Sequence, residues 1–71
     1  MHTINPNKLH HSKWTAAQPS NKEKHFIVTP LLRDEEENVV EVVIEAIYSQ
    51  RERVLPWQSL KDDRVWKVGW Q

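Results

Sequence analysis

The fold class depends on ten residues in the middle of the chain, VVEVVIEAIY at positions 39–48. As a strand, this stretch places five residues on one face: Val40, Val42, Ile44, Ala46 and Tyr48. As a helix, it forms an apolar stripe of Val40, Val43, Ile44 and Ile47. Six of the ten residues are Val or Ile, which lose χ1 freedom in a helix and pack well in a sheet. Composition therefore favours the strand, and the helix stays open as the alternative.

Further strands are predicted on both sides of this segment, near residues 13–17, 25–33, 52–55 and 65–70. Pro30 lies inside the second of these and predicts a bulge or an edge position, because its nitrogen cannot donate to a sheet. Pro56 ends the third and favours one short helical turn near residues 57–61. The strict alternation of the last segment predicts a half-buried strand with one shared face for Trp66, Val68 and Trp70.

We therefore expect an α+β protein, mainly β, with a small antiparallel sheet of about four to five strands and one short helical turn. A length of 71 residues allows one domain. Apolar side chains are sparse near the start, so residues 1–12 are expected to form a flexible or loosely docked arm on a single small domain at 13–71. Residues 18–22 indicate a loop, and the acidic run at 34–38 indicates a turn.

Composition excludes most catalytic and cofactor chemistry. The single glycine excludes the Gly-rich loops that bind phosphates and dinucleotides. The absence of cysteine excludes a disulfide framework, a Cys-based zinc site and a thiol nucleophile. No metal-site spacing connects the four histidines, His2, His10, His11 and His25. We therefore predict no enzyme activity, no metal and no cofactor.

The charge is balanced in total but unevenly spread. Residues 1–33 hold five Lys or Arg and one Glu, whereas residues 34–71 hold five Lys or Arg and nine Asp or Glu. The basic first part and the acidic second part of the chain can form complementary faces of one fold. They can also form a basic binding arm on an acidic body. The zero net charge gives no general attraction to nucleic acid or membranes.

Four tryptophans in so short a chain have three interpretations. Buried indoles can replace the disulfide or metal that small domains usually need. Exposed indoles anchor protein interfaces, and a sheet of this size is not expected to bury all four completely. The interleaving of Lys13 with Trp14 and of Arg64 with Trp66 is typical of single-stranded nucleic-acid binding, although zero net charge weakens that interpretation.

Several short motifs resemble one known family. They are Ser12-Lys13-Trp14-Thr15-Ala16, Asn21-Lys22-Glu23-Lys24-His25-Phe26, Leu55-Pro56-Trp57, and Trp66 with Gly69-Trp70. Together they resemble small tryptophan-rich bacterial proteins classed as a domain of unknown function. The resemblance implies a bacterial setting and carries no activity. The turn at 34–38 departs from it, because that turn lacks the glycine expected in a tight family hairpin.

We predict a non-enzymatic protein-interaction module, with single-stranded nucleic-acid (RNA) binding through Trp stacking and Lys/Arg contacts as the alternative. The expected partner is another protein, and the chain is expected to be a monomer or a weak homodimer. Without a long apolar run or a signal-peptide core, a cytoplasmic location without membrane contact is expected. The candidate binding residues include five that are expected to converge, Lys13, Trp14, His25, Arg64 and Trp70. The other two are Trp57 and Trp66.

Overall fold

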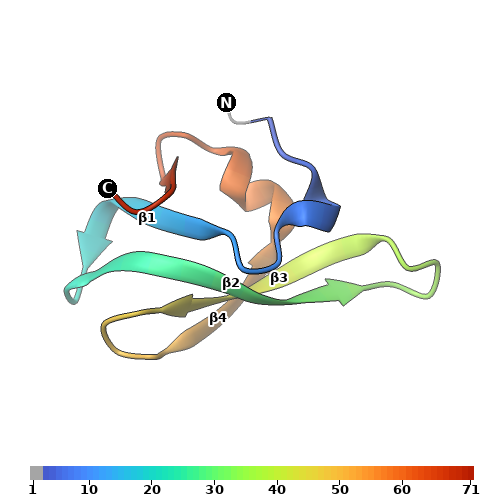
Figure 1. Cartoon of the computed structure of the whole chain (residues 1–71), viewed down its shortest axis with the longest axis horizontal. Helices are drawn as coiled ribbons and strands as arrows, with labels where there is room; N and C mark the ends of the chain where they lie inside the picture. Colours follow the sequence, from blue (N-terminus) through green and yellow to red (C-terminus); the bar gives the residue numbers. More distant parts are fainter. Residues whose placement is uncertain (1–2) are drawn as a thin grey trace.

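The computed structural model describes residues 3–71, so Met1 and His2, the first two residues of the predicted arm, lie outside it. Five strands form one antiparallel sheet in the order β4-β3-β2-β1-β5 (Figure 1). They are β1 (Lys13–Ser20), β2 (Glu23–Arg33), β3 (Val39–Ala46), β4 (Glu52–Pro56) and β5 (Trp66–Val68). Two 3-10 turns complete the fold, η1 (Pro6–Lys8) and η2 (Trp57–Lys61). The predicted mainly β class is confirmed, and residues 3–71 contain no α-helix.

β3 resolves the ambiguity of residues 39–48 in favour of the strand. It pairs with β2 on one side and β4 on the other. This pairing satisfies the backbone of a β-branched segment without the χ1 cost that a helix would impose. Val42, Ile44 and Ala46 are buried on one face, and the alternating residues point to the opposite face. The strand ends at Ala46, and residues 47–49 turn toward β4.

Pro30 lies at a bulge in β2, as its position in the sequence predicts. The register of β2 against β3 shifts between Val28 and Leu31, where the proline nitrogen has no hydrogen to donate. After the bulge, Leu31 packs against the core and Leu32 points to the opposite face.

Each strand differs from its predicted bounds at one end or both, and the changes in β1 and in the last strand have clear local causes. β1 continues to Ser20, so the predicted loop at 18–22 shrinks to Asn21 and Lys22, whose φ angles of 53° and 62° suit a two-residue hairpin turn. The last strand is only Trp66–Val68, because Gly69 turns the chain with a φ of 79°. Trp66 is therefore buried in the core while Trp70 contacts the opposite face of the sheet. The prediction that these two indoles share one face is therefore wrong.

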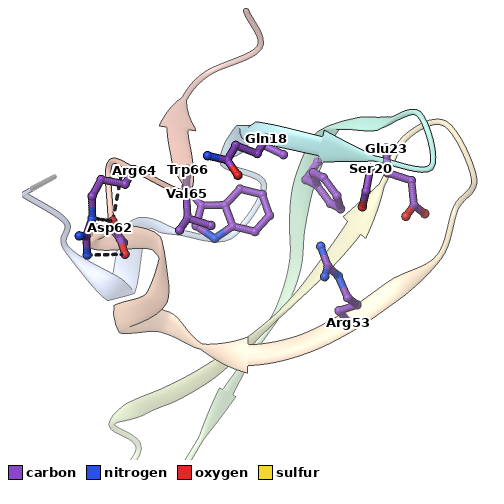
Figure 2. Close-up of a pocket in the computed structure, with 10 residues that line it drawn as sticks. Gln18, Ser20, Glu23, Arg53, Asp62, Arg64, Val65 and Trp66 are labelled. Atoms are coloured by element: carbon purple, nitrogen blue, oxygen red, sulfur yellow. Dashed lines mark hydrogen bonds and ion pairs between the residues drawn. The ribbon is translucent and has the colours of Figure 1, made fainter.

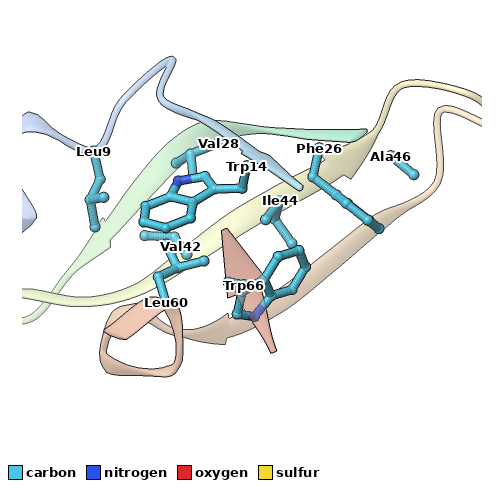
Figure 3. Packing of buried hydrophobic residues seen from close by; sticks show 9 residues of the cluster. All are labelled: Leu9, Trp14, Phe26, Val28, Val42, Ile44, Ala46, Leu60 and Trp66. Carbon is cyan, nitrogen blue, oxygen red and sulfur yellow. The ribbon is translucent and has the colours of Figure 1, made fainter. Parts of the chain in front are cut away.

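One face of the sheet carries the hydrophobic core (Figure 3). The connection from β4 to β5 joins the two edges of the sheet, and it carries η2 over this face. Leu9, from the segment predicted as an arm, and Leu60 of η2 are both buried there. The buried cluster comprises Leu9, Trp14, Phe26, Val28, Val42, Ile44, Ala46, Leu60 and Trp66.

Candidate functional site

Three of the four tryptophans belong to the core side of the sheet. Trp14 and Trp66 are buried, and Trp66 packs edge-on against Phe26 with ring centres 5.1 Å apart. Trp57 is half-buried on η2, and the Lys61 ammonium lies 4.8 Å from its ring centre. These indoles supply much of the apolar volume of a small core. The fourth tryptophan, Trp70, is the most exposed of the four.

Trp70 lies on the sheet face turned away from the core, which we call the open face. Its side chain is 43% exposed, and its indole N–H donates to the Phe26 carbonyl oxygen at 2.9 Å. The Lys13 ammonium lies 4.8 Å from the Trp70 ring centre, and the His25 ring centre lies 5.8 Å away. The fold thus brings together three of the five residues expected to converge. Trp14 and the fifth, Arg64, lie elsewhere.

Thr15 fixes the C-terminal residues over the open face. This side chain is almost fully buried. Its hydroxyl donates to the Gly69 carbonyl oxygen at 2.6 Å and accepts from the Gln71 backbone N–H at 3.0 Å. The His25 Nε2 atom lies 2.9 Å from the Gln71 carbonyl oxygen. The position of Trp70 therefore depends on a threonine that sequence reasoning did not single out.

A cross-strand row on the open face joins a basic end to an acidic end. Lys13 pairs with Ile27, Ile27 with Glu45, and Glu45 with Glu52, so the row runs from β1 to β4. Among residues 3–71, no Lys, Arg or His nitrogen lies within 4.0 Å of the Glu45 or Glu52 carboxylate. Like charges directly opposite one another destabilise a strand pair. The row therefore carries uncompensated negative charge at β3 and β4.

Apolar side chains lie beside this row. Val43 pairs with Val54, and Leu32 pairs with Glu41 beyond the β2 bulge. Val54 and Leu32 are exposed, whereas Ile27 and Val43 are half-buried. The open face is therefore a partly apolar surface with a lysine toward one edge and glutamates toward the other. Contiguous surfaces of this kind commonly mark interaction sites.

A pocket of about 530 Å³ lies on the other side of the sheet (Figure 2). We call it the Trp66 pocket. Gln18 and Ser20 project into it from β1, and Arg53 projects from β4. Arg64 and Trp66, two of the predicted site residues, meet here and not at Trp70. The predicted candidates are thus divided between two faces of the sheet.

The acidic groups at the Trp66 pocket have basic partners. Asp62 Oδ1 accepts a hydrogen bond from Arg64 Nε at 3.2 Å, and this bond holds the pKa of the Asp62 carboxyl below its usual range. Glu23 is nearly buried; its carboxylate accepts a hydrogen bond from the Ser49 hydroxyl and lies 3.5 Å from Arg51 Nε. Both carboxylates are therefore compensated within the chain.

Arg53 differs from the other charged groups of the pocket. Its guanidinium lies 5.5 Å from the centre of the Phe26 ring, in a cation–π arrangement. Within residues 3–71, no carboxylate oxygen lies within 4.0 Å of it. The Gln18 amide and the Ser20 hydroxyl also form no side-chain hydrogen bond in this part of the chain. The pocket therefore holds one guanidinium without a carboxylate partner and two polar side chains without a side-chain hydrogen bond within residues 3–71, and all three residues are exposed.

Sequence reasoning missed Thr15, Arg53, and the pairing of Glu45 with Glu52. Alternation along 39–48 places Glu45 away from the core, but its cross-strand neighbour follows only from the register of the next strand. No local signal distinguishes Arg53 from Arg51, because both lie in the same exposed segment.

The described residues contain no group of three or more His, Cys, Asp or Glu side chains placed to hold a metal ion. No helix in residues 3–71 is long and apolar enough to cross a membrane.

The chain matches a known family. The model of a family described as Tryptophan-rich protein (DUF2389) matches residues 12–71. The matched segment begins one residue before β1, and it contains all five strands and all four tryptophans. No curated protein and no solved structure matches the chain.

Proposed function

The chain belongs to this tryptophan-rich family, a domain of unknown function, and we propose that it acts as a non-enzymatic protein-interaction module. The interaction surface is the open face, and the partner is a second copy of the chain. The observation that supports this most is the row from Lys13 to Glu52. It places opposite charges at the two ends of one partly apolar surface, and neither end is neutralised within residues 3–71.

The row complements itself under a two-fold rotation. In the sheet order, β1 and β4 are equally far from the boundary between β2 and β3. A two-fold axis parallel to the strands at this boundary stacks β1 of one copy over β4 of the other. Lys13 of each copy then faces Glu52 of the other, and the contact occurs twice. Packed sheets lie about 10 Å apart, a gap that opposed lysine and glutamate side chains can bridge.

The size and composition of the open face suit such a contact. The molecule measures 37 × 25 × 15 Å, so its broad face is comparable to the roughly 800 Å² that each partner buries in a standard interface. Val54 and Leu32 are exposed on this face, and Trp70 lies near its β1 side. Stacking two open faces would remove this apolar surface from water, which is the main driving force of association.

Single-stranded nucleic-acid binding has less support. Trp14 and Trp66 are in the core and Trp57 is half-buried, so Trp70 is the most exposed indole for base stacking. The surface beside it carries Glu45 and Glu52, which repel phosphate. Nucleic-acid binding through stacking usually combines several exposed aromatics with a continuous basic groove.

Charge reversal tests the proposed interface. Lys13→Glu and Glu52→Lys each place like charges at both contacts of the dimer. The dimer dissociation constant of each variant alone should therefore be at least ~10-fold higher than that of the native chain. An equimolar mixture of the two variants has opposite charges at both contacts, so dimers should form again. Sedimentation equilibrium at low ionic strength measures all three samples. Added salt should weaken the native dimer, because exposed charges are screened.

Glu35→Lys, in the exposed turn at 34–38, changes the net charge as Glu52→Lys does, so it is the matched control. It should leave the dimer dissociation constant unchanged. A native chain that stays monomeric up to millimolar concentration would overturn self-association. Dimers that persist in both single variants, or a mixture that stays monomeric, would show that the open face is not the interface.

A further inference from the structure

We propose that the Trp66 pocket is a binding site for a small carboxylate with an apolar body, for which benzoate is the probe. The pocket lies on the core side of the sheet, so the site is independent of association through the open face. Its volume of about 530 Å³ falls within the roughly 300–1,000 Å³ of typical small-molecule sites. The ligand class follows from the charge of Arg53, the apolar walls and the polar rim of the pocket.

Arg53 supplies the charge that selects an anion. Its guanidinium lies 5.5 Å from the Phe26 ring centre and has no carboxylate partner within residues 3–71. Stacking on an aromatic ring orients a guanidinium and leaves its N–H edge available. That edge matches a carboxylate through two parallel hydrogen bonds. Figure 2 shows the Arg53 side chain extending from β4 toward the part of the pocket bounded by β1.

The acidic residues at the pocket do not oppose this assignment. Asp62 is hydrogen-bonded to Arg64, and Glu23 is paired with Arg51. Each negative charge therefore has a positive neighbour, and the uncompensated charge at the pocket is that of Arg53. An incoming anion thus meets a net attraction at an exposed guanidinium.

The walls and rim favour a small ligand body with one apolar side. Val65, which is 48% exposed, supplies apolar surface that a ligand can reach. Trp66 and Phe26, which meet edge to face at 90°, also line the pocket but are only 5% and 2% exposed. Apolar walls with a few fixed polar groups are typical of small-molecule sites. At the rim, the Gln18 amide and the Ser20 hydroxyl have no hydrogen-bond partner in residues 3–71. They can contact the second carboxylate oxygen or a substituent of the apolar body.

Benzoate and benzamide form a matched pair of probes, because they share shape and differ in charge. Titration of the full ¹⁵N-labelled chain, followed by ¹H–¹⁵N NMR, should show saturable benzoate shifts. These shifts should be centred on the Trp66 indole N–H and the backbone amides of Ala16 and Val65. Benzamide should bind at least ~10-fold more weakly, because it cannot form the charge-assisted pair with Arg53. Inorganic phosphate tests whether the ring contributes, and it should also bind more weakly than benzoate.

Variants at Arg53 connect the shifts to the proposed contact. Arg53→Gln should weaken benzoate binding at least ~10-fold, and Arg53→Lys should weaken it less, because charge is kept while the forked geometry is lost. Arg33→Gln removes a positive charge at the far end of β2, where Arg33 hydrogen-bonds Asn7 and Glu37, and should leave binding unchanged. Unaltered amide positions elsewhere in each spectrum verify the fold.

Three results would overturn the assignment. They are the absence of saturable benzoate shifts, equal binding of benzamide or phosphate, and full benzoate affinity in Arg53→Gln.

Discussion

Thr15 determines where the end of the chain lies. A threonine hydroxyl can donate one hydrogen bond and accept others, and here it contacts Gly69 and Gln71 at the same time. These contacts hold Trp70 beside Lys13 and His25. One buried hydroxyl thus determines which surface the exposed indole joins.

Replacing Thr15 by valine keeps the shape of the side chain and removes both hydrogen bonds. We expect the free energy of unfolding to fall by about 1–3 kcal/mol, because the Gly69 carbonyl and the Gln71 amide lose their partner. Release of the C-terminal residues should also increase acrylamide quenching of Trp70 fluorescence.

Urea unfolding of Thr15→Val beside Thr29→Val measures the change in stability. Thr29 is half-buried, and its hydroxyl forms one longer hydrogen bond, 3.3 Å to the Val43 carbonyl. Thr29→Val should therefore lower the free energy of unfolding by less than Thr15→Val. Equal losses in the two variants would contradict the special role of Thr15.

Among the elements, the turn between β2 and β3 departs from the usual chemistry of tight hairpins. The Asp34 carboxylate accepts from the backbone N–H groups of Glu36 and Asn38, both at 2.9 Å. Glu37 adopts a φ of 65°, a conformation that glycine tolerates best. Side-chain hydrogen bonds from Asp34 therefore hold a turn in which the expected glycine is missing.

Glu37→Gly should raise the free energy of unfolding by about 0.5–1 kcal/mol. The substitution removes the steric cost of left-handed backbone at a residue with a Cβ, and this gain outweighs the greater entropy of glycine in the unfolded chain. The hydrogen bond from the Glu37 backbone N–H to the Asp34 carbonyl and the bond from the Arg33 guanidinium to the Glu37 carbonyl can both persist.

Thermal unfolding of Glu37→Gly and of Glu35→Gly tests this. Glu35 has no positive φ, so glycine there brings only the entropic cost. If Glu37→Gly is the less stable of the two variants, strain at this turn is not significant.

For the whole molecule, stability depends on one layer of sheet covered on one face. Leu60 comes from η2 near the end of the chain, yet it is fully buried with side chains of β2 and β3. A chain of this size buries only about 60% of the surface that it exposes when unfolded. Each residue that covers the sheet therefore contributes a large share of the free energy of unfolding.

Leu60→Ala should lower the free energy of unfolding by about 2–5 kcal/mol, because it leaves a cavity between η2 and the sheet. Val68→Ala, at a side chain that is 58% exposed on the edge strand, should change it by less than about 0.5 kcal/mol. Urea unfolding at concentrations where the chain is monomeric compares the two. A small effect at Leu60 would show that η2 does not contribute to the core.

Parts of the fold were predictable because short-range chemistry decides them. The strand at β3 follows from its Val and Ile content, the bulge at Pro30 from the missing N–H, and the turn after Pro56 from its fixed φ. The full length of β1 was not predictable. Its end carries Gln18, Pro19 and Ser20, residues typical of loops, and pairing with β2 overrides that preference.

The candidate sites were predictable only in part. Lys13, His25 and Trp70 converge as expected, whereas Trp14 belongs to the core and Arg64 to the pocket. The positions of these residues depend on which strand lies beside which. Neither the period of a pattern nor the spacing of a motif carries that information when the partners are about 50 residues apart.

The sequence by itself determined the strand character of the chain, the absence of thiol chemistry and of Gly-rich phosphate loops, and membership in a tryptophan-rich family. These features rest on residue types and local propensity. Tertiary structure alone decided which indole is most exposed and that Lys13 and Glu52 share one row. It also decided that Arg53 has no carboxylate partner within residues 3–71. Strand register and one positive φ at Gly69 set these outcomes, and both depend on the packing of distant segments.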